Sequence, residues 1–415
     1  MSSRRQRLRF VCAATLATLA LAGCGGEGAG SSANQPETVE TGAGFVDWPF
    51  FGRVPERTHY LPTRDRHLDP PLRLAWSVNT HALIEFPPAI AGGVGYVVNK
   101  YGNGKAIQLN DRKVLWEVNL RPSDKGRQVD VTAPVFHQGR VFGTLLDGYV
   151  AAGSAADGSE IWVRKLKTPI ESSPLPVGGT LYFGTNRLGV LALDTATGRT
   201  RWRFPAPGAV KASPSFHRGR VFVADYESTM FALDADTGKV AWRTNTSRVA
   251  PYGSSGFFSS PAIAFGRVYA ARDDGRVYAF DERTGRVAWS FQTGGAVYGS
   301  PALARVPGTP PTVYIGSEDG VFYALDARTG KVRWRYRVGG PIPGTATVIG
   351  HTVYTSSFAT DRTIGIDVHT RRKTFEAKQA GYTPVVSDGR RLFLVGYFEV
   401  LGLEPAGARK AGSGG

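Results

Sequence analysis

One short motif recurs along this chain and constrains its fold more than any other feature. The pattern Ala-x-Asp-x-x-Thr-Gly-x-x-x-Trp occurs unbroken four times, beginning at Ala192, Ala232, Ala279 and Ala324. Asp and Gly both favour tight turns, and an apolar run precedes the Asp in each copy. The spacing therefore predicts a β-hairpin with the Trp on its second strand, and it predicts a repeat protein.

A complete repeat reads as four antiparallel strands. Residues 313–315 and 321–325 favour strands, and Asp319-Gly320 between them favours a hairpin turn. Residues 331–336 follow the repeated turn, and Ser300-Pro301 opens a strand upstream, because proline lacks a backbone donor. Such a sheet cannot bury both of its faces alone. Units of about 40 to 47 residues are therefore expected to stack radially as a β-propeller.

Weaker copies of the repeat raise the expected number of blades to eight. One of them has Phe375 in place of Trp and Arg371 in place of Gly. The C-terminal residues 391–404 supply strands without a Trp strand, and residues 72–78 supply that strand. We predict an all-β, eight-bladed propeller of four-stranded antiparallel blades, with the ring closed by N- and C-terminal strands so that no sheet edge is left.

The Trp position of the repeat predicts packing between neighbouring blades. One large side chain per blade, always at the same strand position, is typical of a core contact. A stacking platform for a ligand is the alternative. The equivalent positions are Trp76, Trp116, Trp162, Trp202, Trp242, Trp289, Trp334 and Phe375.

Residues 1–23 have the features of a lipoprotein signal peptide. An arginine-rich start precedes residues 10–21, an apolar run too short to span a bilayer. The run ends at Leu21-Ala22-Gly23-Cys24, which resembles the lipobox of bacterial lipoproteins, in which the Cys is lipidated. We expect lipid attachment at Cys24 and an exported protein, anchored on the outer side of the plasma membrane or in the periplasm. A soluble secreted chain with an incidental Cys is the alternative, and the export route stays open.

Four further regions follow from composition and pattern. Residues 24–47 are rich in small residues and acids and are expected to form a flexible tether. Residues 48–70 contain Trp48, a Trp outside the repeat series, and are interpreted as a strap packed on the propeller. The propeller is expected at 71–405 and a disordered tail at 406–415.

No catalytic, metal-binding or cofactor-binding set stands out in the sequence. The seven His residues do not pair at metal-ligand spacings, and the two cysteines are Cys12 and Cys24. Neither a phosphate-binding loop nor a nucleophile elbow is found. The formal charge of +16 is scattered over turns, which is typical of a solvated surface; attraction to anionic lipid or polymer is the alternative. For an exported chain we expect no nucleic-acid partner.

The loops that join the Trp strand of one blade to the next blade should all emerge on one face. Aromatic and basic residues in these loops suggest a recognition surface. Phe257 and Phe258 have an alternative role, which is to fold inward and cap the core. The candidate residues are Lys211, Arg248, Tyr252, Phe257, Phe258, Tyr298 and Tyr382.

The repeat core resembles that of the PQQ-like, or quinoprotein-type, β-propellers over roughly residues 70–405. In one branch of that family, alcohol and glucose dehydrogenases hold pyrroloquinoline quinone (PQQ) and a calcium ion over the axis. Many of the alcohol-oxidising members carry a vicinal cysteine pair, which this chain lacks. The other branch contains BamB-like lipoproteins, which are cofactor-free scaffolds that act through their loops. The motif implies the fold and is less specific for function. The lipobox and the length favour the second branch.

Two functions are therefore expected. The first is a monomeric, lipid-anchored, non-enzymatic propeller that binds envelope proteins or polymer through its loop face and the membrane through the lipid on Cys24. The alternative is a PQQ- and calcium-dependent dehydrogenase or a small-molecule sensor. Carboxylates with an Arg or Lys around the axis would indicate the alternative.

Overall fold

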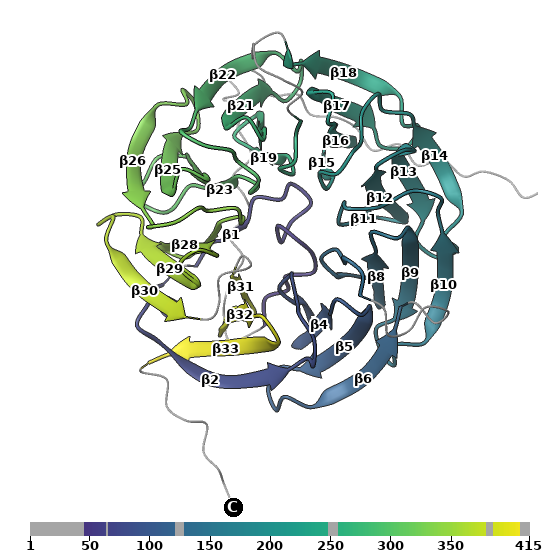
Figure 1. Cartoon of the computed structure of the whole chain (residues 1–415), viewed down its shortest axis with the longest axis horizontal. Helices are drawn as coiled ribbons and strands as arrows, with labels where there is room; N and C mark the ends of the chain where they lie inside the picture. The colour runs from purple at the N-terminus through teal and green to yellow at the C-terminus, as the bar shows by residue number, and fades with distance from the viewer. Residues whose placement is uncertain (1–44, 64, 121–127, 248–255, 379–384, 407–415) are drawn as a thin grey trace, which may run out of the picture. The chain divides into compact units, whose positions relative to one another are not determined.

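The computed structural model describes residues 45–63, 65–120, 128–247, 256–378 and 385–406. These residues lie in one compact unit, Asn34–Gly415. Eight small antiparallel sheets are arranged in a ring (Figure 1), which confirms the eight-bladed, all-β propeller. Within the described ranges there is no α-helix, and so no helix long and apolar enough to cross a membrane. The predicted signal peptide, Cys24 and most of the tether and tail lie outside them.

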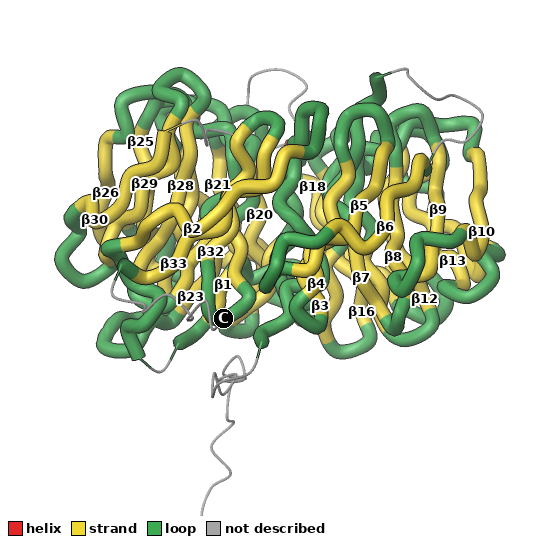
Figure 2. Tube along the Cα trace, turned by 90° about the horizontal axis from the view of Figure 1, so that it is seen from below, coloured by secondary structure: helices red, strands yellow, loops and turns green. Residues whose placement is uncertain are grey.

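Each blade runs from an inner strand at the axis to an outer strand at the rim, and the strands span the two loop-bearing faces of the ring (Figure 2). The strands of blade 1 are β3 (Ala89–Ala91), β4 (Val94–Val98), β5 (Asn103–Gln108) and β6 (Val114–Asn119). Those of blade 2 are β7 (Val135–His137), β8 (Arg140–Thr144), β9 (Tyr149–Ser154) and β10 (Glu160–Lys165). Those of blade 3 are β11 (Leu175–Val177), β12 (Thr180–Thr185), β13 (Gly189–Asp194) and β14 (Thr200–Phe204).

The next three blades repeat this plan. The strands of blade 4 are β15 (Ser215–His217), β16 (Arg220–Ala224), β17 (Thr229–Asp234) and β18 (Val240–Asn245). Those of blade 5 are β19 (Ala262–Ala264), β20 (Arg267–Ala271), β21 (Arg276–Asp281) and β22 (Val287–Gln292). Those of blade 6 are β23 (Ala302–Ala304), β24 (Thr312–Gly316), β25 (Val321–Asp326) and β26 (Val332–Arg337).

Blades 7 and 8 depart from the plan because both use N-terminal strands. Blade 8 combines β31 (Val386–Ser387), β32 (Leu392–Gly396) and β33 (Glu399–Pro405) with β2 (Leu72–Asn79), so the ring is closed as expected. Blade 7 contains β27 (Thr347–Ile349), β28 (Thr352–Ser357), β29 (Arg362–Asp367) and β30 (Lys373–Lys378). It also has a fifth strand, β1 (Tyr60–Leu61), which pairs in parallel with β27. Blade 7 therefore keeps the four antiparallel strands expected of every blade and gains a fifth, parallel strand that was not predicted.

In blades 3 to 6, the repeated motif fastens a blade to the one before it. In blade 5, Asp281 Oδ1 accepts hydrogen bonds from the amide and hydroxyl of Thr284 at 2.8 and 2.7 Å and so holds the turn. Gly285 has φ +73°, and a Cβ there would lie 2.4 Å from the indole of Trp242 in blade 4. Trp242 Nε1 donates to the Glu282 carbonyl at 2.9 Å. Gly is thus required both by the turn and by the indole lying against it.

The hydrophobic core lies in the seams between blades. One buried cluster joins Phe222 and Trp242 of blade 4 to Ile263, Val268 and Tyr278 of blade 5. The indole is only 8% exposed, although it stands on the outermost strand. Because each sheet buries its faces against two neighbours, the ring stabilises blades that would not be stable alone.

Candidate functional site

An N-terminal stretch, the axial segment (residues 45–61), lies inside the ring, where Figure 1 shows it as the purple chain beside β1. It overlaps the strap expected at 48–70. Its carbonyls accept hydrogen bonds from inner-strand amides of six blades, over 2.7–2.9 Å. The donor and acceptor pairs are Ile90 to Trp48, Phe136 to Pro49, Phe216 to Pro55, Ile263 to Glu56, Leu303 to Thr58, and Val348 to His59. The segment therefore satisfies the inner edges of these sheets.

Arg57 reaches from this segment towards blades 3 and 4. Its side chain is fully buried, and its guanidinium donates to the carbonyls of Phe51, Ser173, Pro174 and Pro214. Burial lowers the pKa of Arg57 to about 9, so the group stays charged at neutral pH. Because its donors point at main-chain carbonyls, Arg57 acts as a clamp between the axial segment and the ring.

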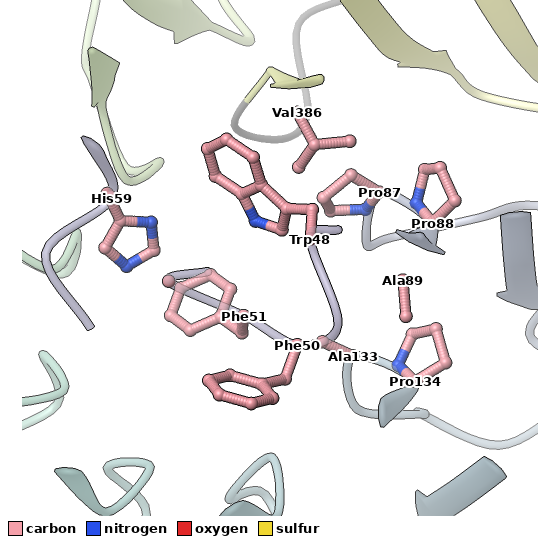
Figure 3. A pocket seen from close by; sticks show the side chains of 11 residues that line it. Trp48, Phe50, Phe51, His59, Pro87, Pro88, Ala89, Ala133, Pro134 and Val386 are labelled. Atoms are coloured by element: carbon pink, nitrogen blue, oxygen red, sulfur yellow. The ribbon is translucent and has the colours of Figure 1, made fainter. Parts of the chain in front are cut away.

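His59 and Trp48 fill the neighbouring part of the axis. Trp48 is 2% exposed and forms an isolated antiparallel bridge with Ile90. Figure 3 shows Trp48, Phe50, Phe51 and His59 around a small cavity. Its volume is only about 10 Å³, close to the room one water molecule needs. Burial, together with the charge on Arg57, lowers the pKa of His59 to about 3. His59 is therefore neutral at physiological pH.

A chain of buried hydroxyls surrounds the axial segment. The amides of Ala133, Ser173, Ser213, Ser260 and Ser300 each donate to the side-chain oxygen of the next member of the series, at 2.9–3.1 Å. The last acceptor is Thr345 Oγ1. These bonds link blades 2 to 7 just before their inner strands begin. These bonds were not predicted from the sequence, although the recurring Ser-Pro pairs were a usable signal.

The axis does not fit PQQ with calcium. The axial segment occupies it, and Arg57 is already bonded to carbonyls. Across the described ranges, no group of three or more His, Cys, Asp or Glu side chains could hold a metal ion. The cavity beside Trp48 is far smaller than a drug-sized ligand requires.

On the face where outer strands lead to the next blade, three aromatic side chains form a line, here called the aromatic row (Tyr226, Phe258 and Tyr298). The ring of Phe258 lies 6.5 Å from Tyr226 and 5.8 Å from Tyr298, edge to face in both cases. Lys211 Nζ stands 4.7 Å from the centre of the Tyr226 ring and 3.2 Å from Glu171 Oε1. Phe258 and Tyr298 are 39% and 40% exposed. The row is a preformed surface with a cation at one end.

Short-range contacts hold the aromatic row in place. The buried Asp225 accepts hydrogen bonds from the amides of Thr229 and Gly208, at 2.9 and 3.1 Å. This fixes the turn that carries Tyr226 against the neighbouring loop. A Cβ on Gly256 would lie 2.7 Å from Tyr226, so only glycine lets the chain that leads to Phe258 approach so closely. Burial raises the pKa of Tyr226, which keeps its hydroxyl protonated.

The structure thus brings together Lys211, Phe258 and Tyr298 of the expected recognition face. Phe257 has to be corrected, because it is fully buried and packs on Tyr278 and Phe280 in the core. The alternative prediction, that both residues fold inward and cap the core, holds for Phe257 and not for Phe258. Arg248, Tyr252 and Tyr382 lie outside the described residues. Tyr226 was not predicted to belong to this face. It lies in the hairpin turn between β16 and β17, where blades 5 and 6 have Asp-Gly, and an aromatic residue in that place was a usable signal.

These features define the class of the protein, an eight-bladed propeller with a filled axis and an exposed aromatic row on its loop face. The family is shown by a match to a known family model. The family model described as "Outer membrane protein assembly factor BamB" matches residues 146–256 and 190–406. The chain therefore belongs to this family of PQQ-like β-propellers.

Individual proteins of both branches are similar to parts of the chain. Outer membrane protein assembly factor BamB of Nitrosomonas eutropha is 31% identical over 114 residues, 28% of this chain and 27% of that protein. Quinohemoprotein alcohol dehydrogenase ADH-IIG of Pseudomonas putida is 29% identical over 192 residues, 40% of this chain and 26% of that protein. The matches span about a quarter of these relatives.

A solved structure supports the same fold over most of the chain. BamB of Moraxella catarrhalis superposes with a TM-score of 0.67 at 19% identity, covering 80% of this chain and 99% of that one. At that identity the likeness shows the fold alone.

Proposed function

We propose that this chain is a lipid-anchored, non-enzymatic scaffold of the cell envelope that binds a partner protein through the aromatic row. The observation that carries the proposal is the contrast between an axis filled by the chain's own residues 45–61 and an exposed, ordered row beside it. Relatives named as outer membrane assembly factors support a protein as the partner. An envelope polymer is the runner-up.

The aromatic row has the composition of an interaction hot spot. Tyr and Phe present large, rigid surfaces that lose little conformational entropy on binding. Lys211 adds a cation that is already held by Glu171 at 3.2 Å and by the Tyr226 ring. A partner with an apolar segment next to a carboxylate would complement this surface.

Site-specific crosslinking tests the partner surface. A photoreactive phenylalanine analogue is placed at Phe258 or Tyr298 and activated in cells. The control carries it at Val240, which is 43% exposed on the outer strand β18. We expect one discrete adduct from positions 258 and 298 and none from 240. Equal, diffuse labelling from all three positions would remove the row as the binding surface.

The membrane anchor is tested separately. In cells that express the full chain, a labelled fatty acid should be incorporated into the wild type and not into Cys24→Ser. The variant should also leave the membrane fraction. Label retained by Cys24→Ser would contradict lipid attachment at this residue.

A further inference from the structure

The seam between blades 6 and 7 is built differently from its neighbours. In the seams on blades 3, 4, 5 and 6, a Cβ added to the turn glycine would come within 2.4–2.8 Å of the preceding indole, which shows how closely that indole docks. Those four indoles are 8–9% exposed. Trp334 of blade 6, the next in the series, is only partly buried. This seam is therefore less tightly closed at its outer end.

Arg371 distinguishes this seam from those on blades 3 to 6. It takes the place of the turn glycine in blade 7 and has φ +61°. A side chain at this position would collide with an indole docked as in the seams on blades 3 to 6. Trp334 packs on Tyr314 of its own blade with ring centres 5.9 Å apart, as the other indoles do in theirs, and it also packs on Phe322 at 6.1 Å.

A pocket of about 370 Å³ occupies this seam. Its apolar wall consists of Tyr336, Val338 and Ile364, and its polar lining comes from both blades. Blade 6 contributes Arg337, and blade 7 contributes Thr360, Arg362, Lys373 and Glu376. Three cations thus face one carboxylate in a volume suited to a small molecule.

Glu376 neutralises only part of this positive charge. Its Oε1 accepts a hydrogen bond from Arg362 Nη1 at 2.5 Å, and its Oε2 is paired with Lys373. The hydrogen bond from Lys373 and the nearby cations lower the pKa of Glu376, which keeps it ionised. Arg337 is exposed and has no ion-pair partner among the described residues. The pocket therefore has donors in place and a net positive charge.

From this geometry we propose that the seam between blades 6 and 7 binds a phosphate-bearing ligand whose ring or apolar portion packs on Tyr336, Val338 and Ile364. Arg337, Arg362 and Lys373 would hold the phosphate, since guanidinium groups match its oxygens in pairs. A phosphorylated sugar and a lipid headgroup share this chemistry. This site lies at the rim and is separate from the aromatic row.

Calorimetric titration of the full-length chain in detergent tests the site. The soluble probe is glucose 6-phosphate, with glucose as its control. The lipid probe is a phosphatidylglycerol vesicle, titrated without detergent into Cys24→Ser to remove the anchor; a phosphatidylcholine vesicle, whose phosphate is balanced by choline, controls for the net charge of the headgroup. We expect phosphate-dependent binding in at least one arm, and the arm that responds identifies the source of the phosphate.

Three single variants make the proposal specific. Arg337→Gln should weaken binding about tenfold, because it removes a charged donor. Glu376→Gln should tighten binding, because it frees Arg362 and Lys373 and removes the competing carboxylate. Arg335→Gln removes an equal charge from the same strand but does not line the pocket, so it should bind as wild type.

Two results would overturn the inference. The first is the absence of phosphate-dependent binding with either probe. The second is an equal loss in Arg335→Gln and Arg337→Gln, which would indicate diffuse surface charge and no defined site. Folding of each variant is checked by its thermal midpoint. The increase in affinity expected for Glu376→Gln cannot come from unfolding, so this variant tests the site even if the others fail to fold.

Discussion

The axis of the propeller and the loop face beside it differ in what covers them. At the axis, carbonyls of residues 45–61 accept hydrogen bonds from inner-strand amides. The side chains of Arg57, His59 and Trp48 in this segment are almost completely buried. On the loop face, Phe258 and Tyr298 keep about two fifths of their surface exposed. The chain thus supplies its own occupant for the place where ring-shaped folds commonly bind ligands and leaves the neighbouring face available. We infer that a partner is bound on the loop face and not at the axis.

Neighbouring residues give the sharpest form of this comparison. Phe257 lies in the core and Phe258 lies in the aromatic row. We expect Phe257→Ala to lower the free energy of unfolding by about 4 kcal/mol through the cavity it leaves. Phe258→Ala should lower the free energy of unfolding by less than about 1 kcal/mol. It should also abolish the adduct formed by the crosslinker at position 298. Urea unfolding and the crosslinking assay measure the two effects. Similar destabilisation by both variants would contradict the division.

Arg57→Met should have the next largest effect. It leaves buried carbonyls without donors, so the expected loss is about 3 kcal/mol. Arg335→Met, an exposed residue on the rim, is the matched control and should stay within about 0.5 kcal/mol of wild type. If both variants unfold at the same urea concentration, Arg57 does not clamp the axis.

The pH dependence of stability should expose the buried His59. Its pKa falls from an ordinary value of 6.5 to about 3 on folding, so between these pH values the unfolded chain binds a proton that the folded chain does not. The free energy of unfolding must then decrease as pH falls, by about 2 kcal/mol between pH 7 and 5. His59→Gln should flatten this slope, and the control His137→Gln, at a half-buried position on the inner strand β7, should keep it. An unchanged slope in His59→Gln would show that His59 titrates normally.

The smallest effect is expected at the cationic end of the aromatic row. Lys211→Met removes a partly exposed ion pair and a cation–π contact, so the change in stability should be about 0.5 kcal/mol. Yield of the adduct from position 258 should fall at the same time, if the partner carries a carboxylate. A loss of several kcal/mol would instead make Lys211 a structural residue like those at the axis.

The fold was largely predictable because the motif is itself the contact that joins blades. Asp, Thr, Gly and Trp keep fixed spacings because the turn at Gly285 must hold the indole of Trp242. Strand β1 was missed, since two residues carry no periodic pattern and pair only because the ring brings β27 beside them. Local pattern therefore predicted repeated elements and failed where a single tertiary contact decides the structure.

The candidate site was only partly predictable for the same reason. Lys211, Phe258 and Tyr298 could be proposed from their loops, but adjacency in sequence did not reveal which of Phe257 and Phe258 points inward. Tyr226 reaches the row because Gly256 permits close approach, a contact between separate loops. Little in the local sequence marks Arg57 as a buried cation, since three of its four carbonyl acceptors, those of Ser173, Pro174 and Pro214, come from residues more than a hundred positions away.

Calorimetric titration of the chain from residue 25 onwards with PQQ and calcium tests the central claim most directly. If residues 45–61 are the permanent occupant of the axis, the titration should give no heat of binding beyond dilution. Arg57→Met, which loosens the clamp, serves as a parallel sample. One-to-one micromolar binding by the wild type, with a dye-linked alcohol oxidation to match, would contradict a filled axis and make the protein a quinone enzyme.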